Sequence, residues 1–219
     1  TEAFASFAKD LGERSQTTTG VRLDFHTNSK NMKFRASSGE KFELLTLRDC
    51  GITEDIPEEQ PTLEGNALQK ASYISQNYGV DCFADDTGLE VEALDDAPGV
   101  FTARFGAMNG YGESHDADAN IQCLLDKLEG APTRNARFRT VIALVKGGKQ
   151  HLFEGIVEGT ILPQRSGEAG FGYDPVFAPK EAGGLSFAQM TAEAKNAISH
   201  RGRATKKFAE HLLKEEPGK

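Results

Sequence analysis

Apolar residues at helical spacing mark two amphipathic helices in this chain. In residues 62–78 they recur every three or four positions, and the same spacing returns in residues 114–128. Gly79 and Gly130 follow these segments closely. A glycine just beyond the last apolar position commonly ends a helix, because it adopts the left-handed conformation without strain. The pattern therefore predicts one helix over each segment.

Short apolar or alternating runs predict the strands of a central sheet. This pattern occupies residues 21–26, 42–47, 80–84, 89–94, 138–145 and 152–162. The turn Gly147-Gly148-Lys149 lies between the last two runs, which predicts a long antiparallel hairpin. Strands combined with amphipathic helices in this way are typical of an α/β fold.

Further segments complete the predicted outline. Residues 27–31 are polar, and a short helical stretch is expected after them up to Ser38. The glycine-rich residues 166–175 are too long and too particular in composition for a simple turn, so we expect this loop to hold a ligand. The C-terminal part is expected to contain helical residues 191–197, an interruption over 198–202 and an amphipathic helix over 203–213.

The composition is that of a soluble globular protein. The 219 residues can bury a sizeable core, and no apolar run approaches membrane-spanning length. We expect a single domain over residues 21–215 in the cytoplasm, preceded over 1–20 by a weakly ordered extension or cloning remnant that lacks the apolar core of a signal peptide. Cys50, Cys82 and Cys123 are far apart in the sequence, which indicates reduced thiols.

The net charge of −8 argues against a dedicated binder of DNA or RNA, whose surface is basic. The charge is unevenly distributed, however, because residues 195–207 contain five basic side chains and no acidic one. Such a cluster suits a small polyanion such as the phosphate tail of a nucleotide. A solvated helix face is the alternative explanation.

An acidic doublet follows one predicted strand. Asp85 and Asp86 come directly after the run 80–84 and precede Gly88. Two adjacent carboxylates repel each other, so burying them together is costly unless a cation neutralises them or one carries a proton. Because ligands gather at the carboxyl ends of strands in open α/β sheets, we expect a divalent metal here. The alternative is an acidic turn in which Gly88 supplies a positive φ.

Four sequence blocks stand in a particular order and spacing. They are Ala84-Asp85-Asp86-Thr87-Gly88-Leu89, Ala97-Pro98-Gly99-Val100, Gly170-Phe171-Gly172-Tyr173-Asp174-Pro175 and Ile198-Ser199-His200-Arg201-Gly202-Arg203-Ala204. Together they resemble the inosine triphosphate pyrophosphatase family, also called Ham1-like, over roughly residues 52–213. The resemblance implies an elongated mixed sheet with flanking helices, two lobes around a nucleotide cleft, and a homodimer. It also implies hydrolysis of noncanonical purine nucleotides (ITP, dITP, XTP) to monophosphate and pyrophosphate with Mg²⁺, which would cleanse the nucleotide pool.

The resemblance also assigns roles to the acidic residues. Asp86 matches the family's catalytic acid, which binds metal and helps to activate water, and Asp85 matches the supporting carboxylate. Glu58 matches a second metal-binding carboxylate, with Glu64 as the reserve candidate. The resemblance thus implies a Mg²⁺ site formed by Glu58, Asp85 and Asp86. Thr87 stands where a serine or threonine contacts the substrate.

The last two blocks imply a base-binding site. The matched residues are Phe171, Gly172, Tyr173 and Asp174 in the loop that clasps the base, and Lys195, His200 and Arg201 at positions that contact the nucleotide from the opposite side. An aromatic ring can stack on a purine, and hydrogen bonds to a six-keto edge disfavour a six-amino group. We therefore expect discrimination against adenine.

The chain departs from the family in the first motif. The family usually has a strand that runs into Thr-x-Asn-x-x-Lys, whose backbone and lysine hold the phosphates. If Thr27 is aligned, Ser29 and Met32 occupy the asparagine and lysine positions. The candidate phosphate contacts are then Thr27, Asn28 and Lys33, with Lys30 as an alternative to Lys33.

These observations predict a Mg²⁺-dependent nucleoside triphosphate diphosphatase with a small-molecule substrate. A metal-activated water would attack a phosphorus of the triphosphate, with Asp86 as the general base. Two other classes remain open. A noncatalytic purine-nucleotide-binding protein would keep the base pocket but lack phosphate positioning at residues 27–33. A metal-dependent phosphatase of another small phosphorylated substrate would ignore the base and release orthophosphate.

Overall fold

The fold is built around one twisted sheet that has helices on both sides. A computed structural model of the protein describes residues 6–10, 21–23, 34–36, 42–47 and 50–214. The strands of its seven-stranded sheet are, in spatial order, β4 (Phe42–Thr46), β1 (Ser6–Asp10), β5 (Cys82–Val91), β7 (Asn135–Lys146), β8 (Lys149–Ile161) and β9 (Phe177–Pro179), with β6 (Pro98–Gly99) beside β5. Every recorded pairing is antiparallel, whereas the resemblance led us to expect a mixed sheet.

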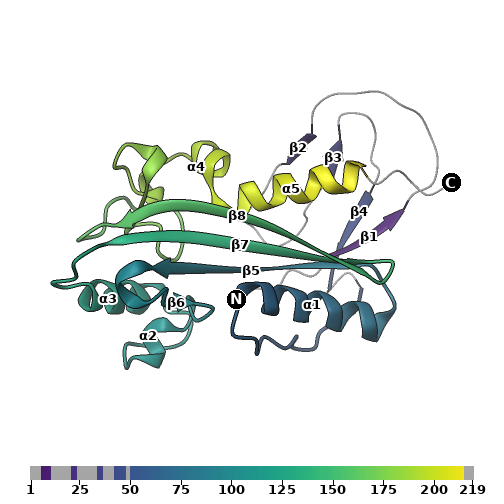
Figure 1. The fold of residues 1–219 in the computed structure, drawn as a ribbon, viewed down its shortest axis with the longest axis horizontal. Coiled ribbons are helices and arrows are strands. Elements are labelled where there is room, and N and C mark those ends of the chain that lie inside the picture. Colours follow the sequence, from purple (N-terminus) through teal and green to yellow (C-terminus); the bar gives the residue numbers. More distant parts are fainter. Residues whose placement is uncertain (1–5, 11–20, 24–33, 37–41, 48–49, 215–219) are drawn as a thin grey trace.

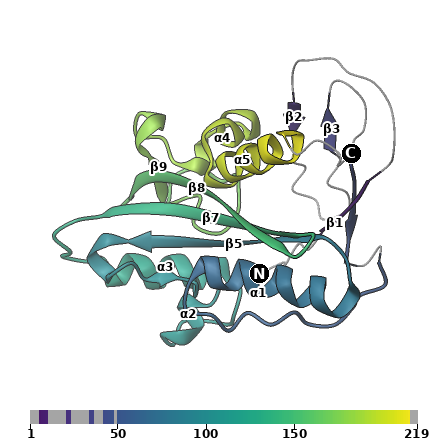
Figure 2. The same ribbon diagram turned by 45° about the vertical axis from the view of Figure 1, so that its right-hand side comes forward.

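The helices form layers on the two faces of the sheet. They are α1 (Leu63–Tyr78), α2 (Phe105–Met108), α3 (Ala117–Lys127), α4 (Ala192–Ile198) and α5 (His200–Lys214), with short 3₁₀ turns η1 (Glu92–Leu94), η2 (Lys180–Ala182) and η3 (Phe187–Gln189). α1 and α3 lie on one side of the long strands, and α4 and α5 lie on the other (Figures 1 and 2). The predicted α/β class with flanking helices is therefore confirmed. No helix in the described part of the chain is both long and apolar enough to cross a bilayer.

The capping residues explain where the helices begin and end. α1 starts after Thr62, whose hydroxyl accepts a hydrogen bond from the third residue of the helix, and it ends at Gly79 with a φ of 67°. α3 begins later than the expected residue 114, because the carboxylate of Asp116 caps the first turn. The expected interruption over 198–202 shrinks to Ser199, after which α5 begins.

The segment that carries the acidic doublet is one continuous strand. β5 pairs with β7 along its whole length, from Cys82 opposite Val145 to Val91 opposite Ala136. The prediction of two strands separated by a turn after Ala84 is therefore wrong. Gly88 is not among the residues with positive φ. A Cβ there would lie 2.7 Å from the carbonyl oxygen of Gly99, so the close approach of β6 requires a glycine.

In the described part of the chain, the middle of β5 is paired along only one of its edges. β7 occupies one edge throughout. On the other edge β1 pairs only with Cys82 and Phe83, and β6 pairs only with Leu89 and Glu90. Within the described ranges no strand pairs with this edge at positions 84–88. We call positions 84–88, which are unpaired on this side within the described residues, the free edge of β5.

The N-terminal elements differ from the expected pattern. β2 (Val21–Leu23) lies in the strand expected over 21–26, whose remaining residues are outside the described ones, and it pairs with β3 (Phe34–Ala36) in a separate two-stranded sheet. The helical stretch expected up to Ser38 is therefore wrong at residues 34–36. β1 joins the main sheet from within residues 1–20, for which we expected a weakly ordered extension.

Core residues on both faces of the long strands hold the helices in place. On the α1 face the buried residues are Leu63, Ala67, Ala71, Ala84, Val141, Ala143 and Val145. On the α5 face they are Phe83, Ile142, Leu144, Ala204, Phe208, Ala209 and Leu212. The start of α5 lies close to β8, since a Cβ on Gly155 would overlap the carbonyl oxygen of His200. This contact fixes the position of the first α5 residues above the sheet.

Candidate functional site

Asp85 and Asp86 point to opposite faces of β5. Successive side chains of a strand alternate between its faces. Ala84, which shares a face with Asp86, packs in the cluster of α1, whereas Phe83 contacts Phe208 of α5 at 4.6 Å between ring centroids. The structure therefore brings only one acid of the doublet to each side of the sheet.

Asp86 lies among polar groups from α1 and from the segment before it. Asn66 Nδ2 donates a hydrogen bond to Asp86 Oδ2 at 3.1 Å, and Lys70 Nζ donates to Asp86 Oδ1 at 3.4 Å. The same Nζ donates to Glu58 Oε1 at 2.9 Å. The Lys70 side chain is only 1% exposed, and that of Asp86 is 5% exposed. We call Glu58, Asn66, Lys70 and Asp86 the carboxylate cluster.

The electrostatics of the carboxylate cluster favour a proton acceptor at Asp86. Burial raises the pKa of Asp86 above its ordinary value, and the charge of Glu58 adds to this effect. The ammonium of Lys70 and the hydrogen bond from Asn66 act in the opposite direction. A carboxylate that binds a proton more tightly than usual is suited to general-base work near neutral pH.

The carboxylate cluster offers donors that suit Mg²⁺. Protein sites usually hold this ion through one or two carboxylates, while water and substrate phosphates complete the octahedron. Glu58 and Asp86 both contact the ammonium of Lys70, so their carboxylates lie close together. These two carboxylates fit the Mg²⁺ pattern. Over residues 50–214 and the shorter described ranges, no group of three or more His, Cys, Asp or Glu side chains could hold a metal ion. Asp85, the third expected ligand, lies on the other face.

On the α5 face, Asp85 and Thr87 contact polar groups of their own. Arg201 Nη2 donates to Asp85 Oδ2 at 3.1 Å, and the Arg201 side chain is 39% exposed. The hydroxyl oxygens of Thr87 and Thr140 are 2.7 Å apart across the β5–β7 pair. Arg201 is therefore close to the free edge of β5 on the side opposite the carboxylate cluster.

The glycine-rich loop places an exposed ring next to a buried ion pair. Lys195 Nζ lies 2.5 Å from Asp174 Oδ2, and Asp174 also accepts a hydrogen bond from the backbone N–H of Phe171 at 2.8 Å. The same ammonium lies 4.5 Å from the centroid of the Phe171 ring, which is 59% exposed. Gly172 follows with a φ of 57°. We call Phe171, Asp174 and Lys195 the Phe171 cluster.

Two residues expected to contact the nucleotide, Tyr173 and His200, are buried. The hydroxyl of Tyr173 donates to the carbonyl oxygen of Thr102 at 3.0 Å, and burial raises the pKa of Tyr173. The ring of His200 stacks on Phe138 at 4.7 Å between centroids. Burial, followed by the charges of Arg201, Lys195 and Arg203, lowers the pKa of His200 well below its ordinary value, so the imidazole is neutral at pH 7. Tyr173 thus holds the glycine-rich loop against Thr102, and His200 packs the start of α5 against Phe138.

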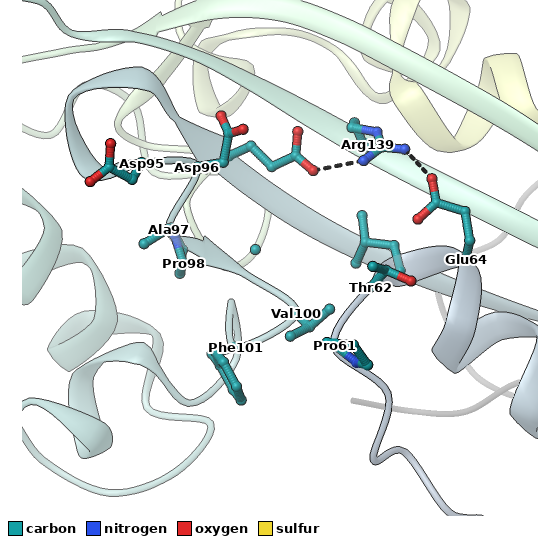
Figure 3. Close-up of a pocket in the computed structure, with 13 residues that line it drawn as sticks. Pro61, Thr62, Glu64, Asp95, Asp96, Ala97, Pro98, Val100, Phe101 and Arg139 are labelled. Atoms are coloured by element: carbon teal, nitrogen blue, oxygen red, sulfur yellow. Dashed lines mark hydrogen bonds and ion pairs between the residues drawn. The ribbon is translucent and has the colours of Figure 1, made fainter.

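Glu64, the reserve candidate for a metal ligand, lines a cavity that does not include the carboxylate cluster. Figure 3 shows it at the rim of a cavity of about 360 Å³ between the start of α1 and the β5–β6 turn. Arg139 bridges Glu64 and Glu90 there. Burial raises the pKa of Glu64, but its own backbone N–H and Arg139 outweigh that effect and lower it overall. None of the other expected site residues lines this cavity.

Two residues of the carboxylate cluster are not among those predicted from the sequence. Asn66 and Lys70 are one helical turn apart on the buried face of α1. That face was predicted from the spacing of apolar residues only, so its polar members were not considered. A polar side chain on an otherwise apolar stripe is the signal that could have revealed them, because burying such a group requires a partner. Thr27, Asn28 and Lys33, the expected phosphate contacts, lie outside the described residues.

Comparisons with known proteins give one consistent result. The sequence model of the Ham1 family matches residues 26–211. A dITP/XTP pyrophosphatase of Porphyromonas gingivalis is 50% identical over 195 residues, which cover 88% of this chain and 97% of the relative. That of Flavobacterium psychrophilum is 48% identical over 188 residues, or 85% of this chain and 96% of the relative. The solved Ham1 protein of Staphylococcus aureus superposes with a TM-score of 0.69 at 36% identity, over 74% of this chain and 82% of that one.

Replacement of Asp86 by asparagine should change how stability depends on pH. Because the folded state raises the pKa of Asp86, ionisation of this carboxyl costs the folded protein stability as the pH rises above about 4. The Asp86→Asn variant avoids that cost. The difference in melting temperature, variant minus wild type, should therefore grow from pH 4 upward when both proteins are unfolded thermally in EDTA.

A Glu113→Gln variant is the control, since this carboxylate is exposed far from the carboxylate cluster. Its melting-temperature difference should stay constant with pH. An Asp86→Asn difference that is constant or shrinks would show that the folded state does not disfavour the Asp86 carboxylate.

Proposed function

The chain belongs to the Ham1 family, and on that premise we propose that it hydrolyses noncanonical purine nucleoside triphosphates such as ITP, dITP and XTP to the monophosphate and pyrophosphate. The activity for which these relatives are named, dITP/XTP pyrophosphatase, supports this substrate class. The same likeness underlies our proposals that the metal is Mg²⁺ and that the protein acts as a homodimer. Length and composition underlie our proposals that the protein acts in the cytoplasm and that residues 21–215 belong to a single domain, whose sheet also includes β1.

One structural observation supports the proposal most directly: the two faces of β5 carry chemically different polar groups at Asp85 and Asp86. The carboxylate cluster lies on the α1 face at Asp86. Arg201 lies on the α5 face at Asp85, and the Phe171 cluster belongs to the same side through Lys195 and His200. A substrate that crosses the free edge of β5 would meet acidic groups at one end and an aromatic ring at the other. A nucleoside triphosphate has a metal-binding phosphate chain at one end and an aromatic base at the other.

At the phosphate end, residues of the carboxylate cluster provide a proton acceptor and a cation. Asp86 would take the proton of the attacking water, since its carboxylate is buried and its pKa is raised. Lys70 holds Asp86 and Glu58 together and would place a positive charge next to the phosphates. A Mg²⁺ ion held by Glu58 and Asp86 would neutralise phosphate charge and polarise water.

At the base end, the Phe171 cluster provides a stacking surface and a fixed donor. The exposed ring of Phe171 can stack on a purine, and the ammonium of Lys195 beside that ring has donors to spare. Asp174 holds that ammonium in place. A six-keto oxygen accepts a hydrogen bond from such a donor, whereas a six-amino group cannot. Inosine and xanthosine nucleotides should therefore be preferred over adenosine nucleotides.

The products of turnover test the proposed reaction. We expect ITP, dITP and XTP, incubated with the protein and Mg²⁺, to give the nucleoside monophosphate and pyrophosphate when the products are separated by ion-exchange chromatography. ATP should be a poorer substrate by roughly 100-fold or more in kcat/KM, because a buried donor would face the donor of the six-amino group. GTP should show whether a two-amino group is tolerated.

Other product patterns identify the alternative classes. Release of orthophosphate without preference for the base indicates a phosphatase. Binding of ITP in a calorimetric titration without turnover indicates a noncatalytic nucleotide-binding protein. Either result contradicts the proposed function.

The Phe171 ring should contribute to binding rather than to chemistry. Removal of a stacking aromatic ring costs about 1–3 kcal/mol per base, so Phe171→Ala should raise the KM for ITP roughly 5- to 150-fold with little change in kcat. Steady-state kinetics measure both constants. Phe101→Ala is the matched control, because this ring is also exposed but lines the separate cavity near Pro98. A KM that is unchanged in Phe171→Ala, or raised equally in Phe101→Ala, would remove Phe171 from the base site.

A further inference from the structure

We propose that Asn66 is a positioning residue, whose side-chain amide holds the carboxylate of Asp86 and the backbone segment that carries Glu58 in one fixed arrangement. This inference rests on the proposed function, in which Glu58 and Asp86 act together. It concerns a residue that does not itself touch the reacting atoms.

The contacts of Asn66 use both ends of one planar amide. Nδ2 donates to Asp86 Oδ2 at 3.1 Å, and Oδ1 accepts from the backbone N–H of Gln60 at 2.9 Å. The residue is only 2% exposed. Both ends of the amide are buried and hydrogen-bonded to other parts of the protein. The Asn66 side chain therefore connects strand β5 to the segment before α1.

That segment lies along α1 and is held at a second point. The backbone N–H of Glu59 donates to Gln69 Oε1 at 3.0 Å. Gly65 permits the close approach, since a Cβ there would lie 2.7 Å from the Cβ of Gln60. Two side-chain amides, Asn66 and Gln69, therefore hold residues 59 and 60 against the helix, and Asn66 is the one of the two that also contacts Asp86.

The two oxygens of Asp86 have different partners, and this difference gives Asn66 its role. Oδ1 faces Lys70, which also binds Glu58, while Oδ2 is held by Asn66. Without the Asn66 donor, the Asp86 carboxylate could rotate about its terminal bond, and Oδ2 would be buried without its partner. Groups that orient ligating or catalytic carboxylates typically change metal affinity or activity by 10–100-fold when they are removed.

Two substitutions separate the two contacts. Asn66→Asp keeps an acceptor for the Gln60 N–H but replaces the donor to Asp86 with a second carboxylate oxygen. Asn66→Leu has a similar shape and removes both contacts. Gln69→Met is the matched control, because it removes the other amide that holds this segment and leaves the contact with Asp86 intact.

The test measures kcat and KM for ITP, the affinity for Mn²⁺ by electron paramagnetic resonance, and the melting temperature of the full chain. We expect both Asn66 variants to lose kcat roughly 10- to 100-fold with KM within about threefold of wild type. Their dissociation constants for Mn²⁺ should rise by about tenfold or more. Gln69→Met should stay within about twofold of wild type in kcat and in Mn²⁺ affinity. If Asn66→Leu does not fold, Asn66→Asp decides the question.

Retention of kcat and Mn²⁺ affinity within about threefold in Asn66→Asp overturns the inference, and so does an equal loss in Gln69→Met. A wild-type protein that binds Mn²⁺ but does not hydrolyse ITP contradicts the proposed function instead. In that case the Mn²⁺ affinities alone decide the role of Asn66. If the wild-type protein hydrolyses ITP but does not bind Mn²⁺ without nucleotide, the kcat values decide the role of Asn66.

Discussion

Side chains of neighbouring strand residues point to opposite faces, and in β5 this rule separates two acids that are adjacent in the sequence. Asp86 meets Asn66 and Lys70 of α1, while Asp85 meets Arg201 of α5. In a fully paired sheet, the backbone would keep the groups of one face apart from those of the other. Among the described residues, β5 has no strand partner on one edge at positions 84–88, and polar groups of both faces lie next to these positions. The proposed nucleotide site depends on that combination of alternation and missing pairing.

The carboxylate cluster shows why such a site is demanding to build. Lys70 is fully buried between two carboxylates, and removal of one partner of a buried ion pair typically leaves an uncompensated charge that costs several kcal/mol. The raised pKa of Asp86 indicates that burial outweighs the help of its neighbours. The hydrogen bonds from the backbone N–H groups of Glu59 and Gln60 to Gln69 and Asn66 keep the neighbouring Glu58 within reach of Lys70. The cluster is thus held by contacts whose main effect is to orient charged groups.

Local signals in the sequence predicted the regular parts of this fold. The helix over 62–78 and the β7–β8 hairpin follow from spacing and turn residues, and the structure confirms both. The middle of β5 was misjudged, because a strand that carries Asp-Asp-Thr-Gly beside a functional edge looks like a turn when hydrophobicity is the only guide. Asn66 and Lys70 were missed for a related reason, since α1 buries polar residues that only a tertiary partner can satisfy. Tyr173 and His200 came from a family resemblance, which matches positions but does not show that their rings are buried.

The turnover numbers of Asp85→Asn and Asp86→Asn, measured side by side with ITP and Mg²⁺, test the division of roles along β5 most directly. Loss of a general base typically costs 10²- to 10⁴-fold, so Asp86→Asn should lose kcat by about that factor. Asp85→Asn should keep kcat within about tenfold of wild type, since its carboxylate lies on the opposite face and binds Arg201. An Asp85→Asn protein that loses as much kcat as Asp86→Asn would contradict this account.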